Sequence, residues 1–249
     1  MFSVFIFLFG LSVGSFLNVV ICRLKSKEPI LLSRSHCPHC GTVLKWFDLI
    51  PLLSFLIQKG KCRYCGQKIS PQYPLVELAT GLSFLIIFNQ FPIFNLFFYL
   101  IIISFLIVIF VYDLKHYLIP DKIVFPAIGL TFLYQFFENS FLNSLLAALL
   151  AAGFFLSLVL ISKGKWMGLG DVKLVGLMGL VLGWPNICLA LFLAFLSGAI
   201  VGIGLIIAGK KGLKSQIPFG PFLSANTVVV LFYGSQLIEK FLTIDNLFI

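Results

Sequence analysis

Long runs of apolar residues, broken by short polar stretches, make up most of the chain. The runs are rich in Leu, Ile and Phe and show no strict alternation of apolar and polar positions. Most approach the roughly 20 residues that a helix needs to cross a bilayer. Spans are predicted at roughly 2–22, 73–89, 95–112, 122–137, 141–161, 171–184, 187–208 and 219–238, of which the sixth is short and glycine-rich. The pattern predicts an all-α polytopic membrane protein of about eight transmembrane helices and excludes an outer-membrane barrel.

The polar stretches divide the chain into three expected segments. These are a first transmembrane helix (1–22), a loop domain (23–72) and a seven-helix transmembrane domain (73–249). The first helix is not preceded by a basic segment and no small-residue cleavage site follows it, so we expect it to be retained. Composition agrees with a bilayer protein, because 60% of the residues are hydrophobic and 11% are charged, against about 25% charged residues in soluble domains.

The distribution of lysine and arginine predicts the orientation. With eight spans, all 18 basic residues except Lys240 fall on one side, many of them in the loop 23–72. Positive charge collects in short cytoplasmic loops, so this side is predicted to be cytoplasmic and both termini non-cytoplasmic. The net charge of +9 then reflects topology. It favours anionic lipids of the cytoplasmic leaflet as partners and gives no reason to expect nucleic acid.

The loop 23–72 carries four of the six cysteines, in two C-x-x-C pairs formed by Cys37, Cys40, Cys62 and Cys65. Each pair can offer two thiolates to one tetrahedral ion, and four thiolates close its coordination shell. The spacing therefore predicts a structural Zn²⁺ site in a cytoplasmic loop. His36 and His39 adjoin the first pair and could replace a thiolate. Two disulfides are the alternative, which a reducing cytoplasm disfavours.

Four of the nine acidic residues fall near the cytoplasmic ends of predicted spans: Glu77, Asp113, Asp121 and Asp171. An ionisable group at this depth is costly unless it is paired, hydrated or functional. The remaining acids are expected to be solvated, among them Glu28 and Asp48 in the loop.

Asp113 and Asp171 stand in matching contexts, because each lies two residues before a lysine, Lys115 or Lys173. Two carboxylates brought close together share a proton. One can then activate water while the other polarises a carbonyl, as in aspartic proteases. This pairing predicts peptide hydrolysis.

Two glycines precede the second aspartate, at Gly168 and Gly170, and would give it an unhindered position. Other interpretations remain open from the residues alone. Asp171 could simply cap the sixth span, and Asp113 could pair with a lysine. Asp121 is the main rival of Asp113 as partner of Asp171, although its place after a proline is typical of a helix cap.

The order of motifs resembles that of bacterial type IV prepilin peptidases, which are GxGD-type intramembrane aspartic proteases. The resemblance rests on GSFLNVVICRL (14–24), the two cysteine pairs, YPLVEL (73–78), DLKHYLIPD (113–121) and GLGDVKL (168–174), and it covers most of the chain. It implies cleavage of the basic leader of type IV prepilins and pseudopilins at the cytoplasmic face of the inner membrane, with the two paired aspartates as catalytic residues. It also implies N-methylation of the new N-terminal residue, commonly Phe, with S-adenosylmethionine as methyl donor.

The resemblance makes Glu77 a candidate for the methyl-transfer or substrate-amine site, because a new N-terminal ammonium needs an anionic partner. Capping of the second span is the plainer interpretation of the same residue. Gly14 and Asn18 lie four positions apart, so they share a helix face that we expect to pack against another span. The segment IPFGPF (217–222) either lines the cleft or forms a turn at a helix entry.

A second class of function is a zinc-stabilised membrane scaffold, or a transporter whose acids carry protons or ions. Transport predicts acids near the bilayer midplane on broken helices. The acids of this chain gather at one membrane face instead, which favours the enzyme.

Overall fold

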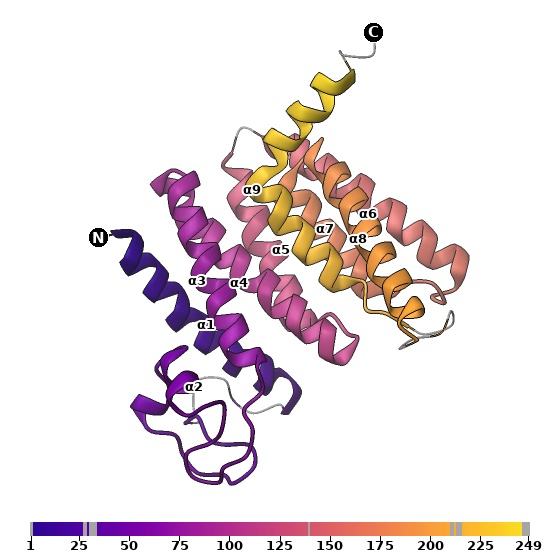
Figure 1. Cartoon of the computed structure of the whole chain (residues 1–249). Helices are drawn as coiled ribbons and strands as arrows, with labels where there is room; N and C mark the ends of the chain where they lie inside the picture. Colours follow the sequence, from indigo (N-terminus) through magenta and orange to yellow (C-terminus); the bar gives the residue numbers. More distant parts are fainter. Residues whose placement is uncertain are drawn as a thin grey trace. The chain divides into compact units, whose positions relative to one another are not determined.

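The computed structural model describes residues 2–26, 29, 34–138, 140–209, 212 and 216–245, with side chains to residue 240. The elements, in chain order, are α1 (Phe2–Ser26), the 3₁₀ helix η1 (Trp46–Asp48), α2 (Leu53–Ile57), α3 (Gln72–Gln90), α4 (Ile93–His116), α5 (Asp121–Phe136), α6 (Phe141–Ser162), α7 (Leu169–Leu182), α8 (Asn186–Ile207) and α9 (Gly220–Asp245) (Figure 1). Within these residues, β-pairing occurs only as two isolated bridges, His36 with Val43 and Lys61 with Lys68.

Five of the described helices are long and apolar enough to cross a membrane: α1, α4, α6, α8 and, over Gly220–Lys240, α9. The chain is therefore an all-helical, multi-pass membrane protein, as the sequence predicted. The helices α3, α5 and α7 coincide with the other three predicted spans. Of these, α7 has 14 residues and a length of only about 21 Å, against the roughly 30 Å of a hydrocarbon core.

The chain divides into two compact units, Met1–Val108 and Ile109–Ile249, and the boundary falls within α4. In the first unit α1 packs closely along α3. A Cβ built on Gly14 would lie 2.7 Å from the Cα of Glu77, so the small residue permits the close approach of the two backbones. One turn further along α1, Asn18 Nδ2 donates to the carbonyl of Tyr73 at 3.1 Å. The expected packing face of Gly14 and Asn18 is thus confirmed.

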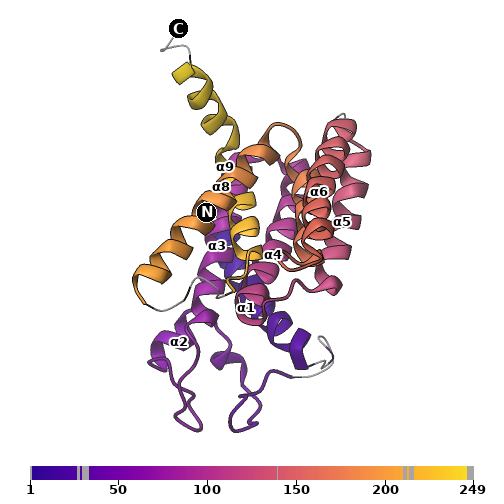
Figure 2. The same cartoon turned by 90° about the vertical axis from the view of Figure 1, so that its right-hand side faces the viewer.

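In the second unit α7 is the central helix and contacts α5, α6, α8 and α9 (Figure 1). The turned view in Figure 2 shows α5 and α6 side by side in the same unit. Its Leu174, Val175 and Leu177 side chains are fully buried. Gly179 lies so close to the backbone of α6 that a Cβ there would overlap Ala148. The glycine content that made this span look weak in the sequence therefore serves tight packing of α7 against α6.

Candidate active site and metal centre

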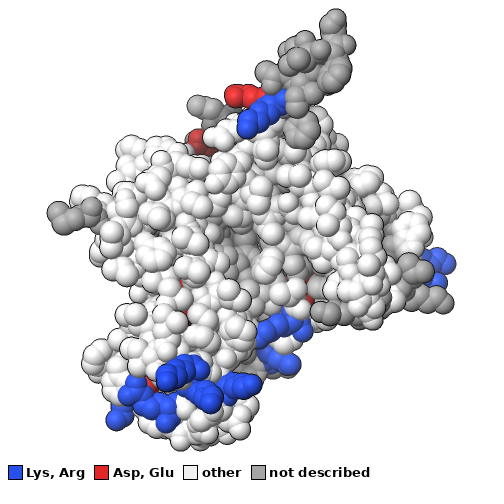
Figure 3. Space-filling view, viewed as in Figure 1, with Lys and Arg blue, Asp and Glu red and all other residues white. Residues whose placement is uncertain are grey.

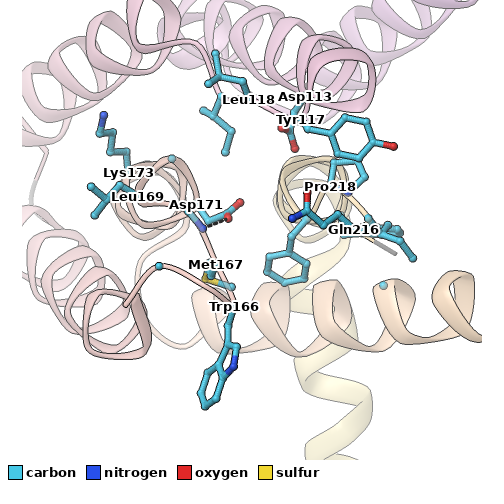
Figure 4. Close-up of a pocket in the computed structure, with 18 of the residues that line it drawn as sticks. Asp113, Tyr117, Leu118, Trp166, Met167, Leu169, Asp171, Lys173, Gln216 and Pro218 are labelled. Carbon is cyan, nitrogen blue, oxygen red and sulfur yellow. Dashed lines mark hydrogen bonds between the residues drawn. The ribbon is translucent and has the colours of Figure 1, made fainter. Parts of the chain in front are cut away.

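A pocket of about 1040 Å³ lies in the second unit. Five parts of the chain line it: the end of α4 with the turn after it, the first residue of α5, the loop before α7 with its first turns, α8, and the segment that leads into α9 with the first turn of that helix. The carboxylates of Asp113 and Asp171 both point into this space (Figure 4). The fold thus brings together the two acids that matched in the sequence.

Asp113 lies in the last turn of α4 and is 4% exposed. Its carboxylate accepts a hydrogen bond from the backbone N–H of Gly220, the first residue of α9. The free N–H groups at a helix N-terminus favour a negative charge. A Cβ built on Gly220 would lie 2.5 Å from Asp113 Oδ2. Glycine at this position therefore lets the helix end reach the carboxylate.

Asp171 lies in the first turn of α7, where its Oδ2 accepts a hydrogen bond from the backbone N–H of Gly168 at 3.3 Å. The capping contact that the sequence offered as an alternative to catalysis is therefore present. It fixes the same carboxylate in the pocket wall, so capping and exposure to the pocket are compatible.

The lysines that follow the two acids have different environments. Lys173 Nζ lies 2.7 Å from Asp121 Oδ1 and forms an ion pair with it rather than with Asp171. Lys115 is exposed and is not part of the pocket lining. Among the residues that the structure describes, no ion pair joins Asp113 to a lysine. Asp121, the rival candidate, lies at the pocket edge with its charge already matched.

The two glycines of the GLGD segment line the pocket and differ in their surroundings. A Cβ on Gly170 would lie 3.2 Å from the Cβ of Ile119, so the glycine lets the turn after α4 pack against α7. A Cβ on Gly168 would meet only atoms at 3.8 Å or more. Its contribution is the backbone N–H that holds Asp171.

Sequence reasoning missed several lining residues, including Tyr117, Trp166 and Gln216. It did single out IPFGPF (217–222), and residues of that segment line the pocket in front of α9. The contact between Gly220 and Asp113 had no signal in the sequence, because it joins helices that are far apart along the chain.

The four cysteines of the first unit form one cluster. Their sulfur atoms all lie within 4.8 Å of one another, and Cys37 Sγ is 4.0 Å from Cys65 Sγ. A tetrahedral zinc ion with Zn–S bonds of about 2.3 Å would place its sulfurs about 3.8 Å apart. The cluster therefore fits a metal. All four are free thiols rather than disulfides, and His36 and His39 are not part of the cluster.

Each pair of cysteines sits on the same kind of turn. Gly41 and Gly66 follow the pairs with φ of +68° and +70°, values that favour glycine. Their N–H groups donate to the carbonyls of Cys37 and Cys62, each at 2.9 Å. The two turns present their thiols in the same way, which is how both pairs can face one ion.

The thiols are also electrostatically suited to a cation. Hydrogen bonding to the side chain and backbone of Thr42 lowers the pKa of Cys40 to about 6. Backbone hydrogen bonds at Cys65 and Tyr64 lower the pKa of Cys62. For Cys65 the Gln67 backbone favours the thiolate, but burial and the neighbouring thiols outweigh it and raise the pKa to about 11. Four thiolates this close need a cation between them.

Asp48 was expected to be solvated, and this expectation is wrong. Its side chain is 2% exposed and forms an ion pair with Arg63 Nε at 3.2 Å. It accepts hydrogen bonds from the Lys45 N–H, the Gln58 side-chain amide and the Tyr64 hydroxyl. Since Arg63 and Tyr64 lie between the second pair of cysteines, Asp48 ties that pair to the 3₁₀ helix η1.

Glu77 belongs to the first unit, whereas the two aspartates belong to the second. Its buried carboxylate accepts the backbone N–H of Leu52 at 2.8 Å and a hydrogen bond from Ser15. Leu52 has a φ of +59°, an uncommon conformation for a bulky residue. Glu77 thereby anchors the loop before α2 to α3.

Basic side chains gather over the cysteine-bearing loop (Figure 3). Among the described residues of this segment, Lys45, Lys59, Lys61, Arg63 and Lys68 are exposed. Four of the basic residues used to predict the orientation lie outside the described residues: Lys27, Lys210, Lys211 and Lys214. Glu28, which was expected to be solvated, also lies outside them.

Comparison with known proteins gives two family matches. Residues 8–91 match the model of the bacterial peptidase A24 N-terminal domain, and residues 100–203 match that of the type IV leader peptidase family. No solved structure gives a significant match.

Three similar proteins each bear the name prepilin leader peptidase/N-methyltransferase. The protein of Bacillus subtilis (strain 168) is 37% identical over 95% of this chain and 96% of its own length. The protein of Myxococcus xanthus (strain DK1622) is 38% identical over 87% of this chain and 67% of its own length. The protein of Aeromonas hydrophila is 32% identical over 96% of this chain and 93% of its own length. Given this similarity along nearly the whole chain, the protein belongs to the type IV leader peptidase family.

Proposed function

We propose that this chain is a prepilin leader peptidase and N-methyltransferase. It cleaves the basic leader from type IV prepilins and pseudopilins and then methylates the new N-terminal residue. Relatives named for both activities match it over almost its entire length. The structural observation that carries the peptidase assignment is that Asp113 and Asp171 both point into the same pocket.

In the proposed mechanism the two aspartates share one proton. The ionised carboxylate takes a proton from water as the water oxygen attacks the scissile carbonyl carbon. The protonated one donates its proton to the carbonyl oxygen. Collapse of the tetrahedral intermediate breaks the C–N bond: the carboxyl that took the water proton gives it to the leaving amine, and the other carboxylate takes a proton back from a hydroxyl of the intermediate. The Gly220 and Gly168 N–H groups hold the two carboxylates in place during these steps.

The environment of the third pocket acid supports this choice of pair. Asp121 is 58% exposed at its side chain and is neutralised by Lys173, whereas Asp113 is buried and has no lysine partner within the described chain. The ion pair with Lys173 keeps Asp121 ionised, so Asp113 is the better partner to share a proton with Asp171.

We further propose the topology that charge placement predicts. The chain crosses the bacterial inner membrane eight times, with both termini non-cytoplasmic. The pocket then lies at the cytoplasmic face, since it lies at the end of α4 and the start of α7, near Lys163, Lys165 and Lys173. In this scheme residues 1–22 form the first span, 23–72 a cytoplasmic zinc-binding domain and 73–249 the protease domain. Anionic lipids are the expected partners of the exposed basic residues.

The metal of the loop is proposed to be Zn²⁺, held by Cys37, Cys40, Cys62 and Cys65. Four thiolates leave no open position for a substrate or water, so the ion is structural. It would fix the two turns against each other and so order the loop between α1 and α3.

Methylation requires the new N-terminal amine to give up a proton and accept a methyl group. S-adenosylmethionine supplies an electrophilic methyl group for this reaction. Glu77 is our candidate residue for this activity, and its contacts support a particular role. Because the carboxylate is buried and already accepts the Leu52 N–H, we propose that it acts by holding the loop in place.

The deciding experiment uses full-length protein in proteoliposomes with a prepilin substrate, analysed by mass spectrometry. Wild-type enzyme should remove the leader and add a methyl group to the product. Asp113→Asn and Asp171→Asn should each abolish cleavage, whereas Asp121→Asn should still cleave, with kcat/KM within about fivefold of wild type. Normal cleavage by either of the first two variants would rule out the pair, and absence of any cleavage by wild type would favour the scaffold or transporter.

A further inference from the structure

The ammonium group of Lys173 fills a small cation site at the edge of the pocket. Its Nζ lies 2.7 Å from Asp121 Oδ1 and 5.0 Å from the centre of the Phe125 ring. Asp121 begins α5 and Phe125 follows one turn later on the same face. A carboxylate and an aromatic ring thus meet one cation together, an arrangement that suits an alkylammonium or a guanidinium.

This site is accessible, and its present occupant is replaceable. The side chains of Lys173 and Asp121 are 30% and 58% exposed, and both residues line the same pocket as the two proposed catalytic aspartates. An ion pair this exposed contributes little to stability. A second cation could therefore take the place of Lys173 with little loss of free energy.

The charge of the protein creates a need for such a site. The chain carries a net charge of +9, and its exposed basic residues repel a basic peptide in bulk. The pocket lining has more acidic than basic residues. Its acids are Asp113, Asp121 and Asp171, and its basic residues are Lys165 and Lys173. Of these acids, Asp121 is the one that the cleavage chemistry leaves free to bind a cation.

We propose that Asp121 and Phe125 form the subsite that receives a basic side chain of the leader, and that Lys173 fills this subsite until the substrate replaces it. The proposal rests on the proposed function and names a specificity-determining residue for it. Lys173 and Asp171 project from different sides of α7 and line the same pocket (Figure 4), so one bound peptide can reach both the subsite and the dyad. Because an extended peptide advances about 3.3 Å per residue, the site is suited to a leader residue some positions away from the scissile bond.

The test uses full-length enzyme in proteoliposomes and two prepilin-type substrates. They are identical except that the basic residues of one leader are replaced by alanine in the other. The quantity measured is the ratio of kcat/KM for the basic leader to that for the neutral leader, at low salt. Asp121→Asn should lower this ratio by about threefold to fivefold, the size expected for an exposed ion pair. Lys173→Met should raise it through a lower KM for the basic leader, because the competitor is gone.

Glu138→Gln is the matched control. It removes the same charge just beyond the other end of α5, away from the pocket lining, and should leave the ratio at the wild-type value. The advantage of the basic leader should also shrink as salt is added.

Two results would overturn the subsite. One is a ratio in Asp121→Asn equal to that of wild type. The other is a Lys173→Met variant whose ratio falls, which would show that the Lys173–Asp121 ion pair serves to hold α5 and α7 together. If Asp121→Asn did not fold, the direction of change in Lys173→Met would decide alone. Failure of wild type to cleave either substrate would instead overturn the proposed function.

Discussion

The backbone N–H of Gly220 donates a hydrogen bond to the carboxylate of Asp113. The contact aims the N-terminus of α9 at the last turn of α4, so a helix end rather than a side chain fixes the proposed catalytic acid. Helix N-termini favour negative charge through their free N–H groups. The position of Asp113 therefore depends on how closely α9 can approach it, and a glycine sets that distance.

Gly220→Ala tests this dependence. The added Cβ would lie 2.5 Å from Asp113 Oδ2, so the carboxylate or the helix end must move. A displacement of about 1 Å can cost about 100-fold in rate, and we expect a loss of that order in kcat/KM for prepilin cleavage. Gly204→Ala is the control, because a Cβ on Gly204 in α8 meets nothing within 4 Å. Equal activity of the two variants would contradict the proposed role of the Gly220 contact.

The cysteine cluster predicts one tightly bound zinc ion per chain in purified protein, measured by elemental analysis. Cys37→Ser and Cys62→Ser should lose the zinc, and limited proteolysis should then cut the loop 23–72 more rapidly. Cys188→Ser, which changes an exposed cysteine outside the cluster, should keep both the zinc and the resistance of the loop to proteolysis. Loss of zinc with no change in stability or proteolysis would argue against a structural ion.

Zinc retention should depend on pH in a defined direction. The pKa of Cys40 is lowered to about 6 and that of Cys62 is lowered as well. Groups with a depressed pKa keep their contribution at higher pH and lose it as pH falls through the folded-state value. At Cys40 and Cys62 protons should therefore compete weakly at neutral pH, whereas the raised pKa of Cys65 already favours its proton there. Zinc release to a chelator should increase further as the pH falls below about 6 and Cys40 becomes protonated. Release that is faster at pH 8 than at pH 5 would contradict the proposed thiolate site.

Asp48 should support the metal without binding it. Asp48→Asn removes the charge that holds Arg63 and weakens the contact with Tyr64, both located between the second pair of cysteines. Changes of this kind typically weaken metal binding by about 10-fold to 100-fold, and we expect about 10-fold in a competition assay with a chromogenic chelator. The same affinity in Asp48→Asn and in the distant Glu138→Gln would show that Asp48 does not support the site.

Glu77 offers a way to separate the two activities. Glu77→Ala removes the acceptor of the Leu52 N–H and should lower methylation at least tenfold while cleavage changes less than threefold. Glu77→Gln keeps an oxygen acceptor and should restore much of the methylation. If Glu77→Gln lost methylation as fully as Glu77→Ala while the loop stayed resistant to protease, the negative charge itself would be required. The measurement is the ratio of methylated to unmethylated product by mass spectrometry.

The sequence by itself determined the membrane class, the positions of the long helices and the candidate residues of both centres. It could do so because local chemistry restricts each of these features. An apolar run of helical length suits a bilayer, and two C-x-x-C pairs suit one tetrahedral ion. An acid beside a bilayer is costly unless it is paired, hydrated or functional. It also predicted that Gly14 and Asn18 share a packing face, because residues four positions apart lie on the same side of an α-helix.

Other features depended on contacts between residues far apart in the chain. Tertiary packing put Asp171 in the pocket while capping its own helix, and gave Lys173 to Asp121 instead of to either proposed catalytic acid. It also buried Asp48 among four partners and brought Gly220 to Asp113. Each of these outcomes depends on which helices approach closely, and close approach is decided by side-chain volume across the whole fold. A residue pattern names the acids, but only the packed helices decide which partner each acid meets.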